Sequence, residues 1–78
     1  MTYPTEENPL ILRKTEKEEI RIYTSTYKGK TRAHMRKYWL DPKEETWKPS
    51  REGVALSAEE LPEALKALHA IQIAGVLN

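Results

Sequence analysis

The alternation of apolar and polar residues in the first two thirds of the chain predicts antiparallel strands. A short apolar run at residues 10–12 predicts a first strand. β-Branched and aromatic residues alternate with a period of two over residues 20–27, and a second alternating run covers residues 31–39. Lys28 and Gly29 lie between these two runs and predict a tight turn, so the two runs should form a hairpin.

The two sides of this hairpin should differ in chemistry, because successive side chains of a strand point to opposite faces. One face is basic and aromatic and holds Arg21, Tyr23, Ser25, Tyr27, Arg32, His34, Arg36 and Tyr38. The other is mainly apolar and holds Ile20, Ile22, Thr24, Thr26, Ala33, Met35, Lys37 and Trp39. Asp41 and Pro42 predict the turn that follows, and two short extended pieces, residues 46–48 and 53–56, should be separated by a bend at Pro49.

The C-terminal segment follows a helical pattern. Ser57 with Glu60 three residues later forms a capping-box signature, and Gly75 is placed to end the helix. The apolar positions with helical spacing are Leu61, Ala64, Leu65, Leu68 and Ile71, and Ala67, Ala74 and Val76 widen this stripe. The stripe is wider than contact with one sheet requires. A partner's helix would explain the width, and a broad contact with the chain's own sheet is the alternative.

Size and composition favour one small intracellular domain that associates with itself. The chain has 78 residues and no cysteine, so its core is small and no disulfide can reinforce it. No run reaches the roughly 20 apolar residues of a membrane span, and the polar N-terminus does not resemble a secretion signal. We expect a flexible tail over residues 1–9 and a domain over residues 10–78, located in the cytoplasm or nucleoid, or in the nucleus of a eukaryote.

The net charge of +1 hides an uneven distribution. Residues 20–39 contain six Lys or Arg residues and no acid, so this window carries +6 and the rest of the chain carries −5. A local excess of this kind attracts polyanions, although a solvated basic hairpin would have the same composition.

The residues give little support to catalysis, and no enzyme activity, metal or other cofactor is expected. The chain lacks a cysteine nucleophile, a phosphate-binding glycine loop and a Gly-x-Ser-x-Gly turn. His34 lies among arginines, where a bound cation would be repelled, and His69 lies on the polar side of the helix.

Five short motifs, in order, resemble the transcriptional positive cofactor four family of single-stranded DNA-binding domains. They are Tyr27-Lys28-Gly29-Lys30, Met35-Arg36-Lys37-Tyr38-Trp39, Asp41-Pro42, Trp47-Lys48-Pro49 and Gly53-Val54-Ala55-Leu56. Glu19-Ile20-Arg21-Ile22 and Glu59-Glu60-Leu61-Pro62 are similar to the short bacterial-type members. The resemblance extends over residues 10–71.

This resemblance implies an α+β fold, with a curved sheet of four antiparallel strands followed by one helix. It also implies a homodimer formed through the helices and sheets, which binds single-stranded DNA with little sequence preference in transcription, replication or repair. The site residues that it implies, with Arg32 added from the basic face, are Tyr27, Lys28, Lys30, Arg32, Arg36, Trp39, Lys48 and Arg51.

The residue types fit this function, because single-strand binders combine cations for the phosphates with flat rings for the bases. Tyr27 lies on the basic face and favours stacking, whereas Trp39 shares its parity with Met35 and has a core position as its alternative. Trp47 has the same two alternatives. RNA binding, or docking of an acidic protein, would use the same cations.

Two departures from the family pattern concern the loops. Glu52 stands where a second lysine is frequent, and the segment between Asp41 and Lys48 is one residue longer. The serine-rich acidic arm of the eukaryotic coactivators has no counterpart in this sequence, which favours general single-strand handling over a coactivator role.

Overall fold

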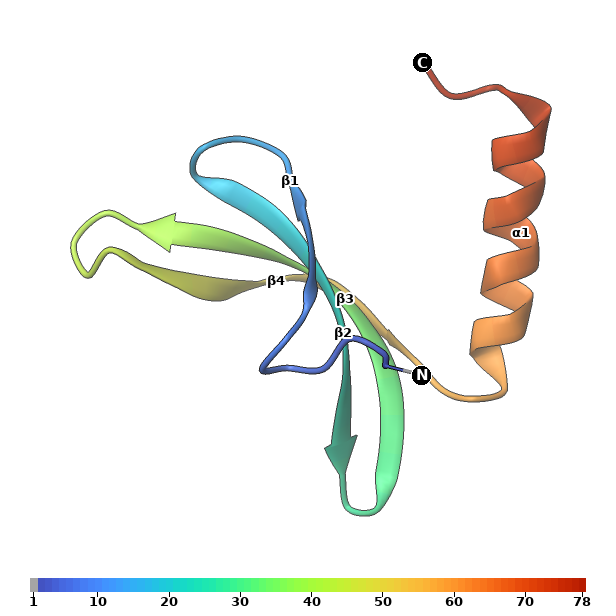
Figure 1. The fold of residues 1–78 in the computed structure, drawn as a ribbon, viewed down its shortest axis with the longest axis horizontal. Coiled ribbons are helices and arrows are strands. Elements are labelled where there is room, and N and C mark those ends of the chain that lie inside the picture. Colours follow the sequence, from blue (N-terminus) through green and yellow to red (C-terminus); the bar gives the residue numbers. More distant parts are fainter. Residues whose placement is uncertain (1) are drawn as a thin grey trace.

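The computed structural model describes residues 2–78 and contains one four-stranded antiparallel sheet and one helix. The strands are β1 (Leu10–Arg13), β2 (Glu18–Tyr27), β3 (Lys30–Asp41) and β4 (Thr46–Leu56), and they lie side by side in chain order. The helix α1 (Glu60–Ala74) follows β4 and stands apart from the sheet (Figure 1). The predicted fold class of four strands and one helix is confirmed.

The β2–β3 hairpin is the longest ladder of the sheet, and its turn matches the prediction. Pairing runs from Glu18 opposite Trp39 to Tyr27 opposite Lys30. Lys28 and Gly29 form the two-residue turn with φ values of 52° and 78°. Positive φ at both central positions is the geometry of a type I′ turn, whose twist suits a hairpin.

This register places the basic side chains and the apolar side chains on opposite faces, as the alternation predicted. The basic face comprises Arg21, Tyr23, Ser25, Tyr27, Lys30, Arg32, His34, Arg36 and Tyr38. The apolar face comprises Leu10, Leu12, Ile20, Ile22, Met35, Trp39 and Val54, together with the threonines and Lys37 of the hairpin.

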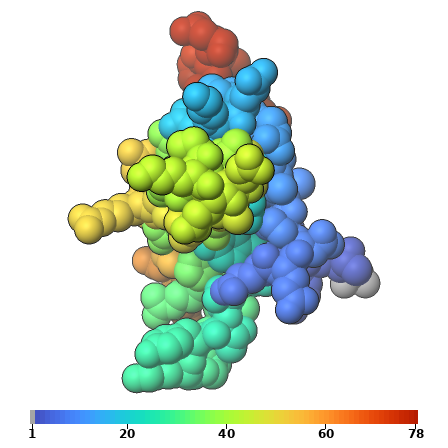
Figure 2. Space-filling model, turned by 90° about the vertical axis from the view of Figure 1, so that its left-hand side faces the viewer, coloured from blue at the N-terminus to red at the C-terminus, as the bar shows by residue number. Residues whose placement is uncertain are grey.

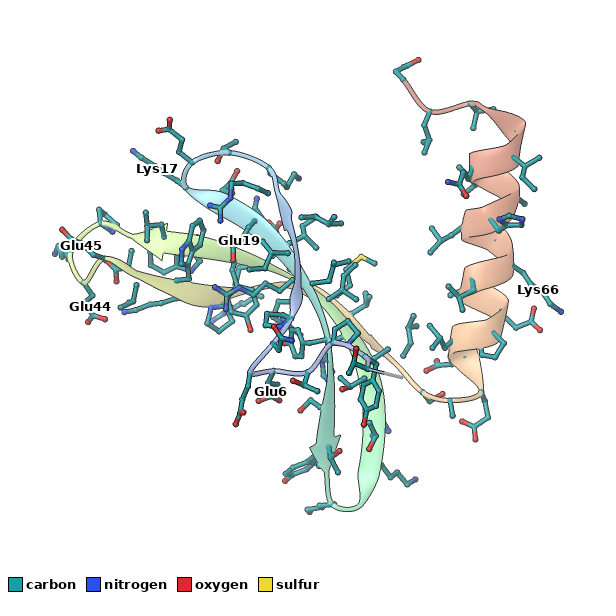
Figure 3. The ribbon with its side chains drawn as sticks, in the orientation of Figure 1. Glu6, Lys17, Glu19, Glu44, Glu45 and Lys66 are labelled. Atoms are coloured by element: carbon teal, nitrogen blue, oxygen red, sulfur yellow. The ribbon has the colours of Figure 1, made fainter. Side chains whose placement is uncertain are left out.

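The few deeply buried side chains lie on the basic face. Tyr23 is 8% exposed and Glu19 is 1% exposed, whereas Met35 and Trp39 on the apolar face are each 39% exposed. Glu19 lies within the sheet, whereas Glu44 and Glu45 lie at the tip of a hairpin and Lys66 on the helix (Figure 3). Its carboxylate binds Arg21 at 2.7 Å and Arg13 at 3.2 Å, so β1 and β2 are joined through one buried anion.

The segment from Thr46 to Leu56 forms one strand instead of the two extended pieces that the sequence predicted. Its pairing with β3 shifts by two residues between Gly53, opposite Arg36, and Pro49, opposite Tyr38. The bend expected at Pro49 occurs at this irregularity, and β4 continues through it because a bulge changes the direction of a strand without ending the ladder.

The helix ends follow the sequence signals. The Glu60 amide donates to the Ser57 hydroxyl at 3.2 Å, and the Ser57 amide donates to the Glu60 carboxylate at 2.9 Å, which is the reciprocal capping box. These bonds lower the pKa of the Glu60 carboxyl below its ordinary value. Gly75, with φ of 66°, ends the helix and donates its amide to the Gln72 carbonyl at 3.2 Å.

Within residues 2–78, no side chain of α1 is buried. The alternative that the apolar stripe covers the chain's own sheet is therefore not what the structure shows. The chain exposes 6769 Å², whereas a compact monomer of 9.1 kDa should expose about 4,900 Å². Its radius of gyration of 14.3 Å likewise exceeds the value of about 11.5 Å for a compact domain of this length.

The segment before β1 has a defined place in the structure. The Pro4 carbonyl accepts hydrogen bonds from the Thr24 amide at 3.0 Å and from the Thr24 hydroxyl at 2.8 Å. In the space-filling view this segment lies on one side of the body, and the tips of the two long hairpins project separately (Figure 2). Met1 of the expected tail lies outside the described residues, and the flexibility of residues 1–9 stays a prediction.

Gly53 provides a test of the β3–β4 packing. A Cβ atom at this position would lie 2.8 Å from Cζ and 3.0 Å from Cβ of Arg36. We expect Gly53→Ala to lower the free energy of unfolding by about 1–3 kcal/mol, as overpacking does, in urea denaturation at fixed protein concentration. Glu52→Ala is the neighbouring control, with an expected change within about 0.5 kcal/mol. Equal stability of the two variants would contradict the close packing of Arg36 on Gly53.

Candidate nucleic-acid interface

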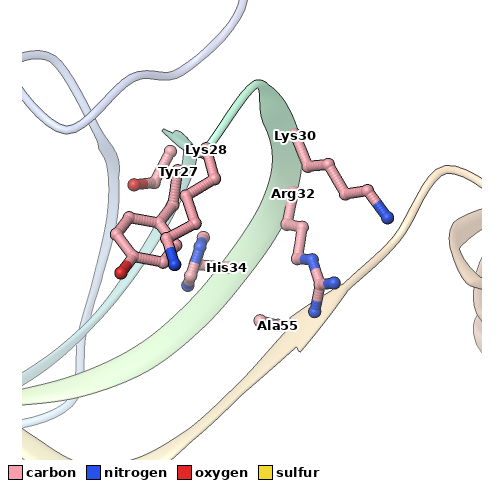
Figure 4. Close-up of a pocket in the computed structure, with 7 residues that line it drawn as sticks. Tyr27, Lys28, Lys30, Arg32, His34 and Ala55 are labelled. Carbon is pink, nitrogen blue, oxygen red and sulfur yellow. The ribbon is translucent and has the colours of Figure 1, made fainter.

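A cavity opens on the basic face at the end of the β2–β3 hairpin. It has a volume of about 510 Å³ and is lined by Ser25, Tyr27, Lys28, Lys30, Arg32, His34 and Ala55 (Figure 4). All but Ala55 belong to the hairpin or its turn. The alternation of β2 and β3 directs the side chains of these strands that line the cavity to one face. The turn brings Tyr27 and Lys30 opposite each other at the rim.

Tyr27 presents its ring to solvent at the edge of the cavity. The side chain is 75% exposed, and Nζ of Lys28 lies 5.4 Å from the ring centroid. An exposed ring beside a cation has the two features that a nucleotide needs, a flat surface for the base and a positive charge near the phosphate.

Four cations of the basic hairpin have no acidic partner in the part of the chain that the structure describes. Within residues 2–78, no ion pair is made by Lys28, Lys30, Arg32 or Arg36.

The other two cations of the +6 window are paired. Arg21 binds Glu19, and Lys37 binds Glu18 at 2.8 Å and Glu52 at 3.5 Å. The pairing with Glu18 raises the pKa of Lys37 and lowers that of Glu18.

Arg36 lies farther along the same face and is fixed by β4. Its Nη1 donates to the Ser50 carbonyl at 3.0 Å, within the irregular part of the strand. Arg51, another predicted site residue, is the next residue of this segment and is exposed. The irregular segment therefore brings the backbone beside Arg51 into contact with Arg36, which the sequence order alone did not indicate.

The structure does not bring Lys48 and Trp39 to the cavity. Trp39 belongs to the apolar face and lies opposite Lys48 in the β3–β4 register. Nζ of Lys48 binds Asp41 and Glu44, each at 2.9 Å, and the bond to Asp41 is the main cause of its raised pKa. The role of both residues in binding stays a prediction, and for Lys48 it would require exchanging carboxylate partners for phosphate.

Sequence reasoning missed a second set of aromatic contacts on the basic face. Tyr23 and His34 stack in parallel, Cζ of Arg21 lies 4.2 Å from the Tyr38 ring centroid, and Cζ of Arg13 lies 5.4 Å from that of Trp47. The parity of the hairpin already placed four of these residues on one face, and the register supplied the pairings. Trp47 is half-buried and packs with Arg13.

The face does not carry an assembly of metal ligands. Among residues 2–78 there is no group of three or more His, Cys, Asp or Glu residues that could hold a metal ion. Within the same residues, no helix is long and apolar enough to cross a membrane.

The family model described as Transcriptional Coactivator p15 (PC4) matches residues 14–68. No curated protein matches the sequence.

Several solved structures share the fold at low sequence identity. A bacteriophage T5 homologue of the eukaryotic coactivator PC4, implicated in recombination-dependent DNA replication, is 24% identical, with a TM-score of 0.72 over 88% of this chain and 81% of its own. A PC4 homologue from Burkholderia pseudomallei is 20% identical, with a TM-score of 0.74 over the full length of both chains. MoSub1 in complex with single-stranded DNA is 22% identical, with a TM-score of 0.58 over 94% of this chain and 83% of its own.

Tyr38 provides a spectroscopic test of the packing on this face. Burial, followed by the hydrogen bond with Tyr23, raises the pKa of Tyr38 to about 12. The pKa is higher in the folded state than the ordinary value of about 10. The contribution of the protonated Tyr38 to the free energy of unfolding is therefore complete below pH 10 and is lost as the pH rises toward 12.

We expect the ultraviolet titration of tyrosinate in the native protein to contain a late step that Tyr38→Phe removes. In urea the parent's late step should return to about pH 10. The exposed Tyr27 provides the control, since Tyr27→Phe should leave the late step in place. If Tyr38→Phe instead removes a titration step near pH 10 from the native protein, the Tyr38 hydroxyl is not buried.

Proposed function

This chain belongs to the Transcriptional Coactivator p15 (PC4) family, and from that premise we propose that it binds single-stranded DNA through its basic face, with little sequence preference. The observation that carries the proposal is the cavity that brings Tyr27, Lys28, Lys30 and Arg32 together. These three cations and one exposed ring provide phosphate contacts and a stacking surface within one cavity.

The fold likeness supports the same assignment. MoSub1, which shares the fold, was solved with single-stranded DNA, and the phage T5 homologue is implicated in recombination-dependent replication. A role in transcription, replication or repair follows from the proposed ligand, as does an intracellular location. Binding would require no chemical step and no cofactor, so the proposal is a binding protein and not an enzyme.

We propose further that two copies pair through the helix and the apolar face. The chain exposes about 1,900 Å² more than a compact monomer of its mass, and its exposed large side chains include Leu65, Leu68 and Ile71 on α1 and Met35 and Trp39 on the sheet. A second copy offers both surfaces at once, since a two-fold axis repeats every contact. Pairing on the apolar face would leave the basic face open to the nucleic acid.

Binding is tested by fluorescence anisotropy with a labelled oligo-dT over a range of salt concentrations. Tyr27→Ala should weaken binding by about 1–3 kcal/mol, the value of one stacked base, and leave the salt dependence unchanged because no cation is lost. Lys30→Gln should reduce the slope of log affinity against log salt by about 0.7, the value for one phosphate of a single strand.

The matched control is Lys66→Gln, which removes a lysine on the helix, away from the cavity. A duplex of the same length should bind more weakly, and an oligo-U tests RNA as the alternative ligand. Failure of the parent protein to bind any of these at low salt would refute the proposed function and direct attention to acidic protein partners.

Dimerisation is tested by sedimentation equilibrium. Leu68→Asp places a charge in the apolar stripe, and we expect it to shift the protein from dimer to monomer, because burial of an unpaired carboxylate is costly. His69→Asp makes a similar change at the adjacent position, outside the stripe, and should remain a dimer. A monomeric parent protein, or an unchanged Leu68→Asp dimer, would contradict pairing through this surface.

A further inference from the structure

A pair of stacked rings lies at the cavity, and the proposed phosphate contacts do not use it: His34 lines the cavity, and Tyr23 lies behind it. Tyr23 and His34 are direct partners across β2 and β3, with ring centroids 5.1 Å apart and an interplanar angle of 1°. Tyr23 is buried, and the Tyr38 hydroxyl lies 3.5 Å from its hydroxyl. One face of the His34 imidazole is therefore covered by a ring that is itself held in place.

The other side of His34 borders open space. Its partner on β4 is Ala55, and both residues line the cavity. A methyl group leaves room above the strand that a larger side chain would fill. Because β4 is the edge strand of the sheet, no further strand among residues 2–78 closes this side. Figure 4 shows the His34 ring beside β3, on the side of Tyr27, and the Arg32 side chain extending toward Ala55.

We infer that the space above Ala55, beside His34, holds one nucleobase of a bound single strand, stacked on the imidazole face that Tyr23 does not cover. The inference rests on the proposed function and adds a second stacking position to that of Tyr27. Stacking on a flat ring tolerates any base. Lys30 and Arg32 line the same cavity and would contact the phosphates on either side of this base.

An acidic peptide would use the same cations differently. Its carboxylates would contact Lys30 and Arg32, but nothing in such a ligand would need the flat face of His34 or the open space above Ala55. The cavity therefore favours a ligand with alternating anions and rings, which a single strand provides.

The decisive variant is Ala55→Leu, which fills the space and removes no cation. We expect its affinity for oligo-dT to fall by roughly 5- to 150-fold, the loss of one stacked base, with an unchanged slope of log affinity against log salt. Ala70→Leu is the matched control. It adds the same side chain on the exposed helix, outside the apolar stripe, and should bind as the parent does.

A second pair of variants tests the ring and does not depend on the folding of Ala55→Leu. His34→Ala should lose affinity in the same range, and His34→Phe, which keeps a flat ring, should retain most of the parent's affinity. Thermal unfolding of each variant separates loss of binding from loss of the fold.

The outcomes distinguish this inference from the proposed function. If the parent does not bind oligo-dT, the proposed function fails and the inference fails with it. If the parent binds and a folded Ala55→Leu binds equally well, the second stacking position is wrong and single-strand binding stands. Equal losses in His34→Ala and His34→Phe would also overturn the stacking role of the ring.

Discussion

The ladder between β2 and β3 is the constraint on which the rest of the structure depends. It pairs ten residues of each strand without interruption, from the Lys28–Gly29 turn to Trp39. A slip of one residue would move every side chain of one strand to the opposite face. The type I′ turn fixes the register at one end, and the Glu19 carboxylate between Arg13 and Arg21 fixes the position of β1 at the other.

This register produces an unusual division of burial between the two faces. The most buried groups, Glu19 and Tyr23, are polar or amphipathic and lie on the side that carries the cations. Aromatic rings and guanidinium groups pack against each other there, which gives a rigid surface whose charges remain accessible. The apolar face, by contrast, is left half exposed, because the helix stands away from it.

The exposed apolar surface and the exposed basic surface have different consequences. Exposed apolar side chains gain free energy when they are removed from water, so they direct the chain toward association. Cations that lack acidic partners stay hydrated at little cost and attract polyanions. The two properties are compatible because a sheet separates them, and a partner on one face leaves the other free.

The sequence by itself determined the hairpin with its turn, the two chemically distinct faces and the helix with both of its caps, because each depends on local spacing along the chain. The fold class followed from the order of the family motifs. It also placed Tyr27 and Arg32 on one face of this hairpin, with Lys28 and Lys30 beside the glycine of its turn. Only the tertiary structure decided that Lys48 is paired with Asp41 and Glu44, that Trp39 lies away from the cavity, and that His34 has Tyr23 on one side and Ala55 on the other. These facts depend on pairing between strands and on the irregularity in β4, and neither is encoded in the spacing of a single segment.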